Sequence, residues 1–133
     1  MTASAVPPSA FELVRLVGEK GLAATETLVT EICGNNVGAC LEEGPLNSLG
    51  YELLGQDLPK DAVAALEIAA WSHPLSANAQ DSLADAYLSI HDREGARHAL
   101  ERAIALAPAD PSLDAGSKDP FIASATARLR ALN

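Results

Sequence analysis

The chain has 133 residues, of which 48% are hydrophobic and only 4% aromatic, and this balance favours closely packed Ala- and Leu-rich helices over a β-sandwich. Its net charge of −9 argues against sequence-independent binding to nucleic acids or to anionic membranes, since both need clustered Lys and Arg. No apolar run approaches the roughly 18 residues of a membrane span, and "MTASAVPPSA" lacks the basic and apolar regions of a signal peptide. A cytoplasmic location is therefore expected, or a periplasmic or secreted one if the sequence is a fragment of a longer chain.

The N-terminal region predicts a lead-in and one helical hairpin. Residues 1–8 end in two prolines and are expected to be disordered. Ser9 is followed three positions later by Glu12, the pattern of a capping box at a helix start. A second helix is expected from Leu22 to Ile32, so that residues 9–33 form a helical hairpin. The inward positions of the first helix are predicted to be Phe11, Val14, Leu16 and Val17.

Two cysteines, Cys33 and Cys40, flank the segment "GNNVGA" within a loop expected from Cys33 to Pro45. They suit either a short disulfide, which needs an oxidising compartment, or two ordinary reduced thiols. A metal site is not expected, because six intervening residues do not match a zinc motif and no second Cys/His pair lies nearby. No cofactor is expected either.

An internal repeat occupies the middle of the chain. When residues 46–76 are aligned with residues 80–110, nine of 31 positions are identical. Apolar residues follow the i, i+3, i+4, i+7 spacing of a helix, and no segment alternates with the period of a strand. Pro74 and Pro108 end the two copies at the same position. The spacing predicts two helical hairpins, repeat 1 over residues 43–76 and repeat 2 over residues 77–110.

This pattern resembles the tetratricopeptide repeat (TPR), a 34-residue helical hairpin with bulky, Leu-Gly, Tyr, Ala, Phe, Ala and Pro positions. The departures are mild: Leu replaces Phe in both copies, Ala84 replaces Gly, and Gln80 replaces the bulky residue. The resemblance implies an all-α, TPR-like solenoid. Its residues in the first copy are Leu46, Leu49, Gly50, Leu53, Ala62, Leu66, Ala69 and Pro74, and in the second Gln80, Leu83, Ala84, Tyr87, Ala96, Leu100, Ala103 and Pro108.

The sequence also looks like the C-terminal repeat domains attached to some bacterial serine hydrolases. In those domains a degenerate hairpin precedes the repeats and a helix closes them, roles that residues 9–33 and 120–132 would fill. A single domain over residues 9–133 is then expected. The closing helix is predicted to direct Ala123, Ala127, Leu129 and Leu132 inward, and Arg128 and Arg130 outward.

In the resembled family the first helix of each hairpin lines a concave surface, and that face can also be located from helical spacing. Asp81 and Asp85 lie four residues apart and so point the same way. A groove that is part apolar and part acidic would bind a peptide or helix with basic and apolar residues. The alternative is a solvated face with incidental apolar residues. The candidate binding residues are Asn47, Tyr51, Leu54, Asn78, Asp81, Asp85, Leu88 and Ser89.

No constellation of nucleophile, base and acid is recognisable, and the Gly-x-Ser-x-Gly and Ser-x-x-Lys hydrolase motifs do not occur. The expected function is therefore a protein–protein interaction module that is not an enzyme. The alternatives are a regulatory or oligomerising accessory domain of a bacterial hydrolase, and a helical protein that binds a small ligand. A homodimer is possible. The identity of the partner does not follow from the sequence.

Overall fold

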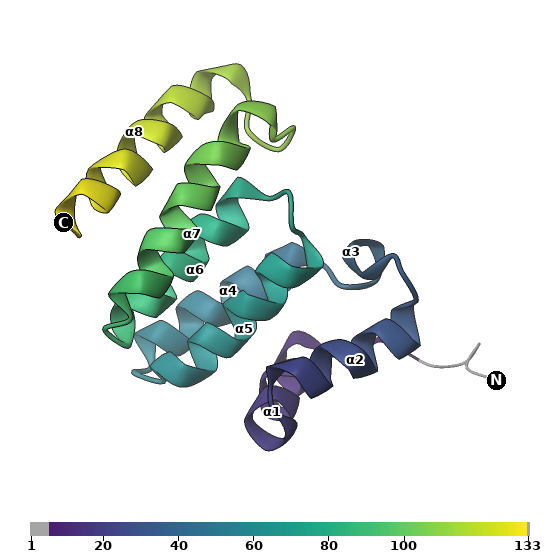
Figure 1. Ribbon diagram of the computed structural model, residues 1–133. Coiled ribbons are helices and arrows are strands. Elements are labelled where there is room, and N and C mark those ends of the chain that lie inside the picture. Colours follow the sequence, from purple (N-terminus) through teal and green to yellow (C-terminus); the bar gives the residue numbers. More distant parts are fainter. Residues whose placement is uncertain (1–5, 133) are drawn as a thin grey trace. The chain divides into compact units, whose positions relative to one another are not determined.

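The computed structural model describes residues 6–132, which form helices joined by short turns, with no strand among them (Figure 1). The all-α prediction is confirmed. Residues 1–5 of the predicted lead-in lie outside the described residues. The helices are α1 (Ala10–Lys20), α2 (Leu22–Cys33), α3 (Val37–Cys40), α4 (Glu43–Gly55), α5 (Pro59–Ser72), α6 (Ala77–Ser89), α7 (Arg93–Leu106), the short 3-10 helix η1 (Ala107–Ala109) and α8 (Ala115–Ala131).

The chain divides by its contacts into two compact units, residues 1–73 and 74–133. The described part of the first unit holds α1 to α5, and that of the second holds α6 to α8. The boundary falls inside the region for which the sequence predicted a single domain, close to the junction of the two repeats. Each unit contains one of the two repeated hairpins, α4–α5 or α6–α7.

The two hairpins have the same helix boundaries, displaced by 34 residues. Their turns repeat as well, because Asp57 and His91 both adopt the left-handed conformation, with φ of 60° and 61°. This conformation closes a Schellman-type helix end, in which two backbone N–H groups reach back to free carbonyls of the preceding helix. In each turn, the bond that spans more residues runs from Leu58 N to Leu53 O or from Asp92 N to Tyr87 O, with a distance of 2.9 Å in both.

Small residues allow the helices of the first hairpin to approach closely. A Cβ atom built on Gly50 would lie 2.5 Å from Cγ of Leu66, so the Leu66 side chain occupies the space above the glycine. Leu66 and the neighbouring Ala62, Ala65 and Ala69 are completely buried. At the repeat positions of α4 and α5, Leu46, Gly50, Leu53, Ala62, Leu66 and Ala69 are buried, whereas Leu49 is only half-buried. The close contact explains the glycine in the first copy.

In the first unit, α1 begins with the predicted capping box: Ser9 Oγ accepts from the Glu12 backbone N–H, and the Glu12 carboxylate accepts from the Ser9 N–H. The inward residues of α1 are Leu13 and Val14, which pack in apolar clusters with α4 and α5. Phe11 does not face inward as expected from the sequence, since 70% of its surface is exposed. The core stripe of α1 is displaced because Leu13, omitted from the predicted stripe, takes the central position.

The segment predicted as a loop from Cys33 to Pro45 contains the short helix α3 and the start of α4. Cys33 and Cys40 are joined by a disulfide with a Cα–Cα distance of 5.8 Å, within the usual range. His73 Nε2 lies 2.7 Å from the carbonyl of Leu41, and this contact connects the end of α5 to the residue after α3. The segment is thus tied to the first unit at both of its ends.

In the second unit, α8 packs against α7 (Figure 1) and begins five residues earlier than the Pro120 start predicted. The cause is Asp114, whose carboxylate accepts from the Ser117 N–H at 2.9 Å and caps the helix. Ala123 and Ala127 are exposed, contrary to the sequence prediction, and Ala125 is buried instead. The inward stripe consists of Phe121, Ala125, Arg128, Leu129 and Leu132, which are all buried or half-buried.

A buried carboxylate connects the two ends of the second hairpin. Asp110, only 4% exposed, accepts from the backbone N–H of Ala77 at 2.8 Å and from the N–H and hydroxyl of Ser112. Burial acts to raise the pKa of Asp110, but the hydrogen bonds from Ser112 and Ala77 and the charge of Lys118 outweigh it, so the pKa is lowered. Asp110 thus holds the start of α6 next to the end of α7.

Candidate functional site

On α4, the predicted binding residues differ in their accessibility. Tyr51 is 42% exposed, whereas Leu54 is half-buried and packs against an apolar cluster of the first unit. Asn47 is half-buried, and its side-chain oxygen is shielded from solvent with no hydrogen-bond partner among the described residues. Tyr51 is therefore the residue of this face best placed to contact a partner.

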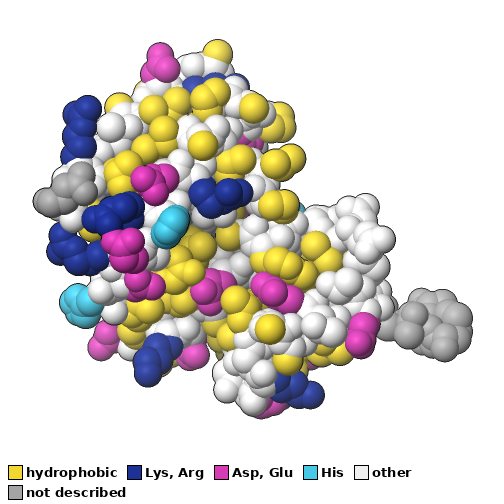
Figure 2. Space-filling model, viewed as in Figure 1, with side chains coloured by type: hydrophobic (Ala, Val, Ile, Leu, Met, Phe, Trp, Pro, Cys, Tyr) yellow, Lys and Arg dark blue, Asp and Glu magenta, His cyan; other side chains and the backbone are white. Residues whose placement is uncertain are grey.

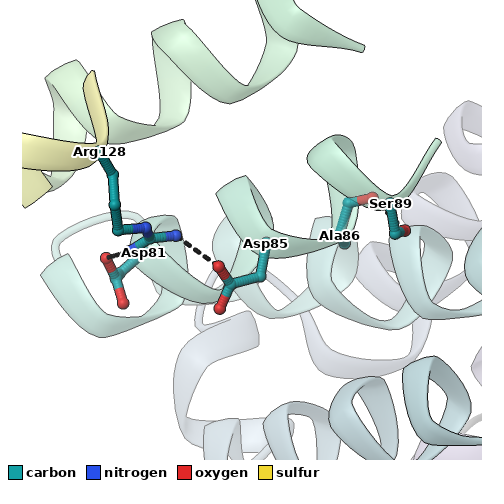
Figure 3. A network of polar contacts seen from close by, with 5 residues as sticks. All are labelled: Asp81, Asp85, Ala86, Ser89 and Arg128. Atoms are coloured by element: carbon teal, nitrogen blue, oxygen red, sulfur yellow. Dashed lines mark hydrogen bonds and ion pairs between the residues drawn. The ribbon is translucent and has the colours of Figure 1, made fainter. Parts of the chain in front are cut away.

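On α6, the predicted residues Asn78 and Ser89 are exposed and Leu88 is half-buried. The hydroxyl of Ser89 donates to the carbonyl of Ala86 at 2.6 Å, a local bond within the last turn of the helix (Figure 3). Ser89 thus satisfies a backbone carbonyl near the helix end, which accounts for its position without a ligand.

The structure brings Asp81 and Asp85 of α6 together around a single guanidinium group. Arg128 of α8 reaches across to α6, where its Nη1 lies 2.5 Å from Oδ1 of Asp81 and its Nη2 pairs with Oδ1 of Asp85 (Figure 3). The prediction that Arg128 faces outward is wrong. A planar guanidinium with several fixed donors suits this shared arrangement.

The cluster of Asp81, Asp85 and Arg128 is half-buried and carries one more negative than positive charge when all three groups are ionised. Burial raises the pKa of Asp81; Arg128 acts to lower it, and the neighbouring Asp85 acts to raise it further. The net shift is upward. Burial, the largest of these effects, therefore outweighs the pairing with Arg128 and favours the protonated form of Asp81.

Sequence reasoning found the two carboxylates but missed their internal partner. The signal was available in the spacing of Phe121, Ala125, Leu129 and Leu132, a stripe with helical period that places Arg128 at its edge. A Lys or Arg at the edge of an apolar stripe can cover the interface with its hydrocarbon chain while its charged end reaches a partner.

The described side chains, residues 6–132, contain no group of three or more His, Cys, Asp or Glu that could hold a metal ion. Near the second hairpin, Glu94 pairs with Arg97 on the surface of α7. Trp71 packs against an apolar cluster of the first unit.

Charged groups of both signs share one face of the molecule. Figure 2 shows acidic, basic and hydrophobic side chains interspersed over the face in view. A scan of protein-family models finds no match to the chain, and a search of curated proteins finds no significant match. Among the described residues, no helix has both the length and the apolar character needed to cross a membrane.

Proposed function

We propose that the chain is a protein-interaction module of the TPR type that binds peptide or helix segments of a partner through two faces, each in its own unit, the outer face of α4 and the outer face of α6, and that it performs no catalysis. The observation that carries the proposal is the pair of half-buried carboxylates, Asp81 and Asp85, which α6 presents together around one arginine. Tyr51 on α4 adds an exposed aromatic side chain, a residue type enriched at binding hot spots.

Two features of the chain support this proposal. The sequence carries the TPR pattern in both copies, and the two hairpins have identical helix boundaries at the repeat length. The net charge of −9 favours a basic partner, and a basic side chain would share the carboxylates with Arg128. The partner segment is therefore expected to combine Lys or Arg with apolar residues.

The experiment is affinity capture from a lysate of the source cell with three baits: the wild type, Tyr51→Ala, and Asp81→Lys with Asp85→Lys. Circular dichroism establishes that each bait is folded. A protein that the wild type retains and both variants lose supports binding through α4 and α6. A partner retained equally by all three baits contradicts the proposed faces.

A variant of Arg128 tests the role of the two carboxylates from the opposite direction. Replacement of Arg128 by Ala removes the internal cation that pairs with both carboxylates, so Arg128→Ala is expected to bind a basic partner more tightly than the wild type does. Titration of purified partner by isothermal calorimetry measures this change. An unchanged affinity would show that the carboxylates take no part in binding.

The disulfide favours an oxidising compartment over the cytoplasm expected from the sequence, because structural disulfides persist where thiols are not kept reduced. Mass spectrometry of protein alkylated directly in the source cells tests this inference. The two cysteines should escape alkylation unless a reductant is added first. Complete alkylation without reductant would show that the cysteines are reduced in the cell, and would indicate a reducing compartment.

A further inference from the structure

The first unit also has a concave surface, which is distinct from the faces of α4 and α6 discussed above. It is a groove of about 360 Å³ between α1, α4 and the start of α5, and its surface is mostly apolar. Phe11, 70% exposed, and Leu58, 43% exposed, are apolar side chains that line it and remain open to solvent. Its other apolar lining residues are Val14, Leu49 and Leu53.

The groove is separate from the face proposed to bind a partner. Leu49 and Leu53 lie on one side of α4, and Tyr51 projects from the opposite side at 100° per residue. The displacement of Phe11 from the core keeps a large ring at the edge of the groove instead of filling it. Exposed apolar side chains around a concavity are typical of a docking site for another chain.

The second hairpin indicates what the groove lacks. The positions of Leu53 and Asp61 in the first hairpin correspond to Tyr87 and Gly95 in the second, 34 residues further on. A Cβ atom on Gly95 would lie 2.9 Å from Cγ of Tyr87, so the tyrosine ring packs directly on the glycine. An aromatic side chain of the chain itself therefore occupies a position that in the first hairpin borders the groove.

The charges around the groove favour a partner segment that has a basic residue next to such a ring. Arg15 is paired with Glu19 at 3.1 Å, so its charge is already compensated. Asp61 also lines the groove, and within residues 6–132 the structure gives its carboxylate neither a hydrogen bond nor an ion pair. Asp57 is an exposed acid in the turn just before α5. Lys60 lies beside both acids at the start of α5, so one of their two negative charges remains uncompensated at this end of the groove.

From these observations we propose that the α1–α4–α5 groove is a docking site for a partner segment that inserts an aromatic side chain and places a Lys or Arg beside Asp61. The ring packs between Phe11 and the leucines of α4, as Tyr87 packs within the second hairpin. The basic side chain pairs with the Asp61 carboxylate. This site is independent of the faces of α4 and α6 proposed above.

The test uses the full chain as the target of a displayed library of random 12-residue peptides. The most enriched sequence is then synthesised, and its dissociation constant is measured by fluorescence anisotropy. Gly18 lines the groove, and a Cβ atom there meets no atom within 4 Å, so Gly18→Leu is expected to occlude the groove, and circular dichroism checks that the variant folds. Gly44 in α4 is equally open and lies outside the groove lining, so Gly44→Leu is the matched control.

We expect enriched peptides that combine an aromatic residue with Lys or Arg, and at least tenfold weaker binding to Gly18→Leu than to Gly44→Leu. Reversing the charge in Asp61→Lys should weaken binding severalfold, whereas the same reversal at exposed Glu31 of α2 should not. Tyr51→Ala should bind as the wild type does, which separates this site from the α4 face.

Several outcomes would overturn the proposal. One is the absence of any enriched peptide, and another is enrichment of peptides that bind Gly18→Leu and Gly44→Leu equally. Enrichment of acidic peptides would contradict the role of Asp61. If analytical ultracentrifugation shows a dimer that Gly18→Leu dissociates, the occupant of the groove is a second copy of the chain and not a basic partner segment.

Discussion

The two repeated hairpins have the same helix boundaries but obtain their close packing at different places. In α4–α5 the small residue is Gly50, and Leu66 fills the space above it. The equivalent positions in α6–α7 are Ala84 and Leu100, both completely buried. The second hairpin thus accepts one more methyl group at the position where the first has none.

Near the turn, it is the second hairpin that has the glycine and the first that has the larger residue at that position. The second hairpin has Gly95 against the ring of Tyr87, whereas the first has Asp61 and the smaller Leu53 at those positions. The repeat therefore does not preserve a residue at each position. In each hairpin a large side chain on one helix is matched by a small residue on the other, but at a different place.

The largest effect is expected from the leucines at equivalent positions, Leu66 and Leu100. Each is completely buried, so replacement by Ala should lower the free energy of unfolding by about 2–5 kcal/mol through lost burial and a residual cavity. Urea denaturation followed by circular dichroism measures the loss. Leu75→Ala, at a residue 74% exposed, is the control and should be nearly neutral. A loss below about 1 kcal/mol at only one of the two leucines would mean that the hairpins are not equivalent in energy.

A somewhat smaller effect is expected at Gly50. In Gly50→Ala the new methyl group meets Leu66, and the overpacking should cost about 1–3 kcal/mol. Gly44→Ala makes the same change in the same helix at an open position and should instead be neutral or slightly stabilising. Thermal unfolding of the two variants side by side distinguishes them, and equal stability would show that the helices separate at little cost.

A substitution of Asp110 tests the hydrogen bonds that connect the two ends of the second hairpin. Asp110→Ala leaves the buried Ala77 N–H without its partner and should cost about 1–3 kcal/mol at pH 7. Because the pKa of Asp110 is lowered on folding, its stabilisation is complete above the ordinary value of 3.8 and is lost as the pH falls through the lower folded value.

The difference in the free energy of unfolding between wild type and Asp110→Ala should therefore shrink on acidification from pH 5 to pH 2. The same titration on both proteins cancels the contribution of Asp81, whose pKa is shifted upward. A difference that stays constant with pH would show that the Asp110 hydrogen bonds do not depend on its charge.

The smallest effects are expected at the two turns. Asp57 and His91 hold a left-handed conformation that favours glycine, so Asp57→Gly and His91→Gly should each stabilise the chain by about 0.5–1 kcal/mol. Gln56→Gly, one residue earlier with a φ of −92°, should destabilise it. Calorimetric melting temperatures provide the measurement, and destabilisation by both turn glycines would mean that the side chains contribute more than the backbone costs.

Much of the fold could be predicted from the sequence because helical spacing and capping residues act locally. The core positions of both hairpins, the Ser9 cap and the all-helical class follow from such patterns. The start of α8 was missed because Asp114 caps it ahead of a proline, and a proline six residues into a helix was read as its beginning. The helix α3 is too short for its periodicity to be recognised.

The candidate site was predicted only in part. The spacing of Asp81 and Asp85 placed two carboxylates on one face, but their partner Arg128 comes from a helix 43 residues further along the chain than Asp85. The groove beside α1 depends on Leu13 taking the inward position expected for Phe11. Contacts between distant segments depend on tertiary packing, which local patterns do not specify.

The Cys33–Cys40 disulfide also determines how the protein responds to a protease. It closes a small covalent ring around the exposed residues 34–36, with a sequence separation of 7 between its cysteines. A cut within the ring would leave both halves of the chain covalently attached. A nicked molecule should therefore migrate as one band on a denaturing gel without reductant and as two bands once reductant is added.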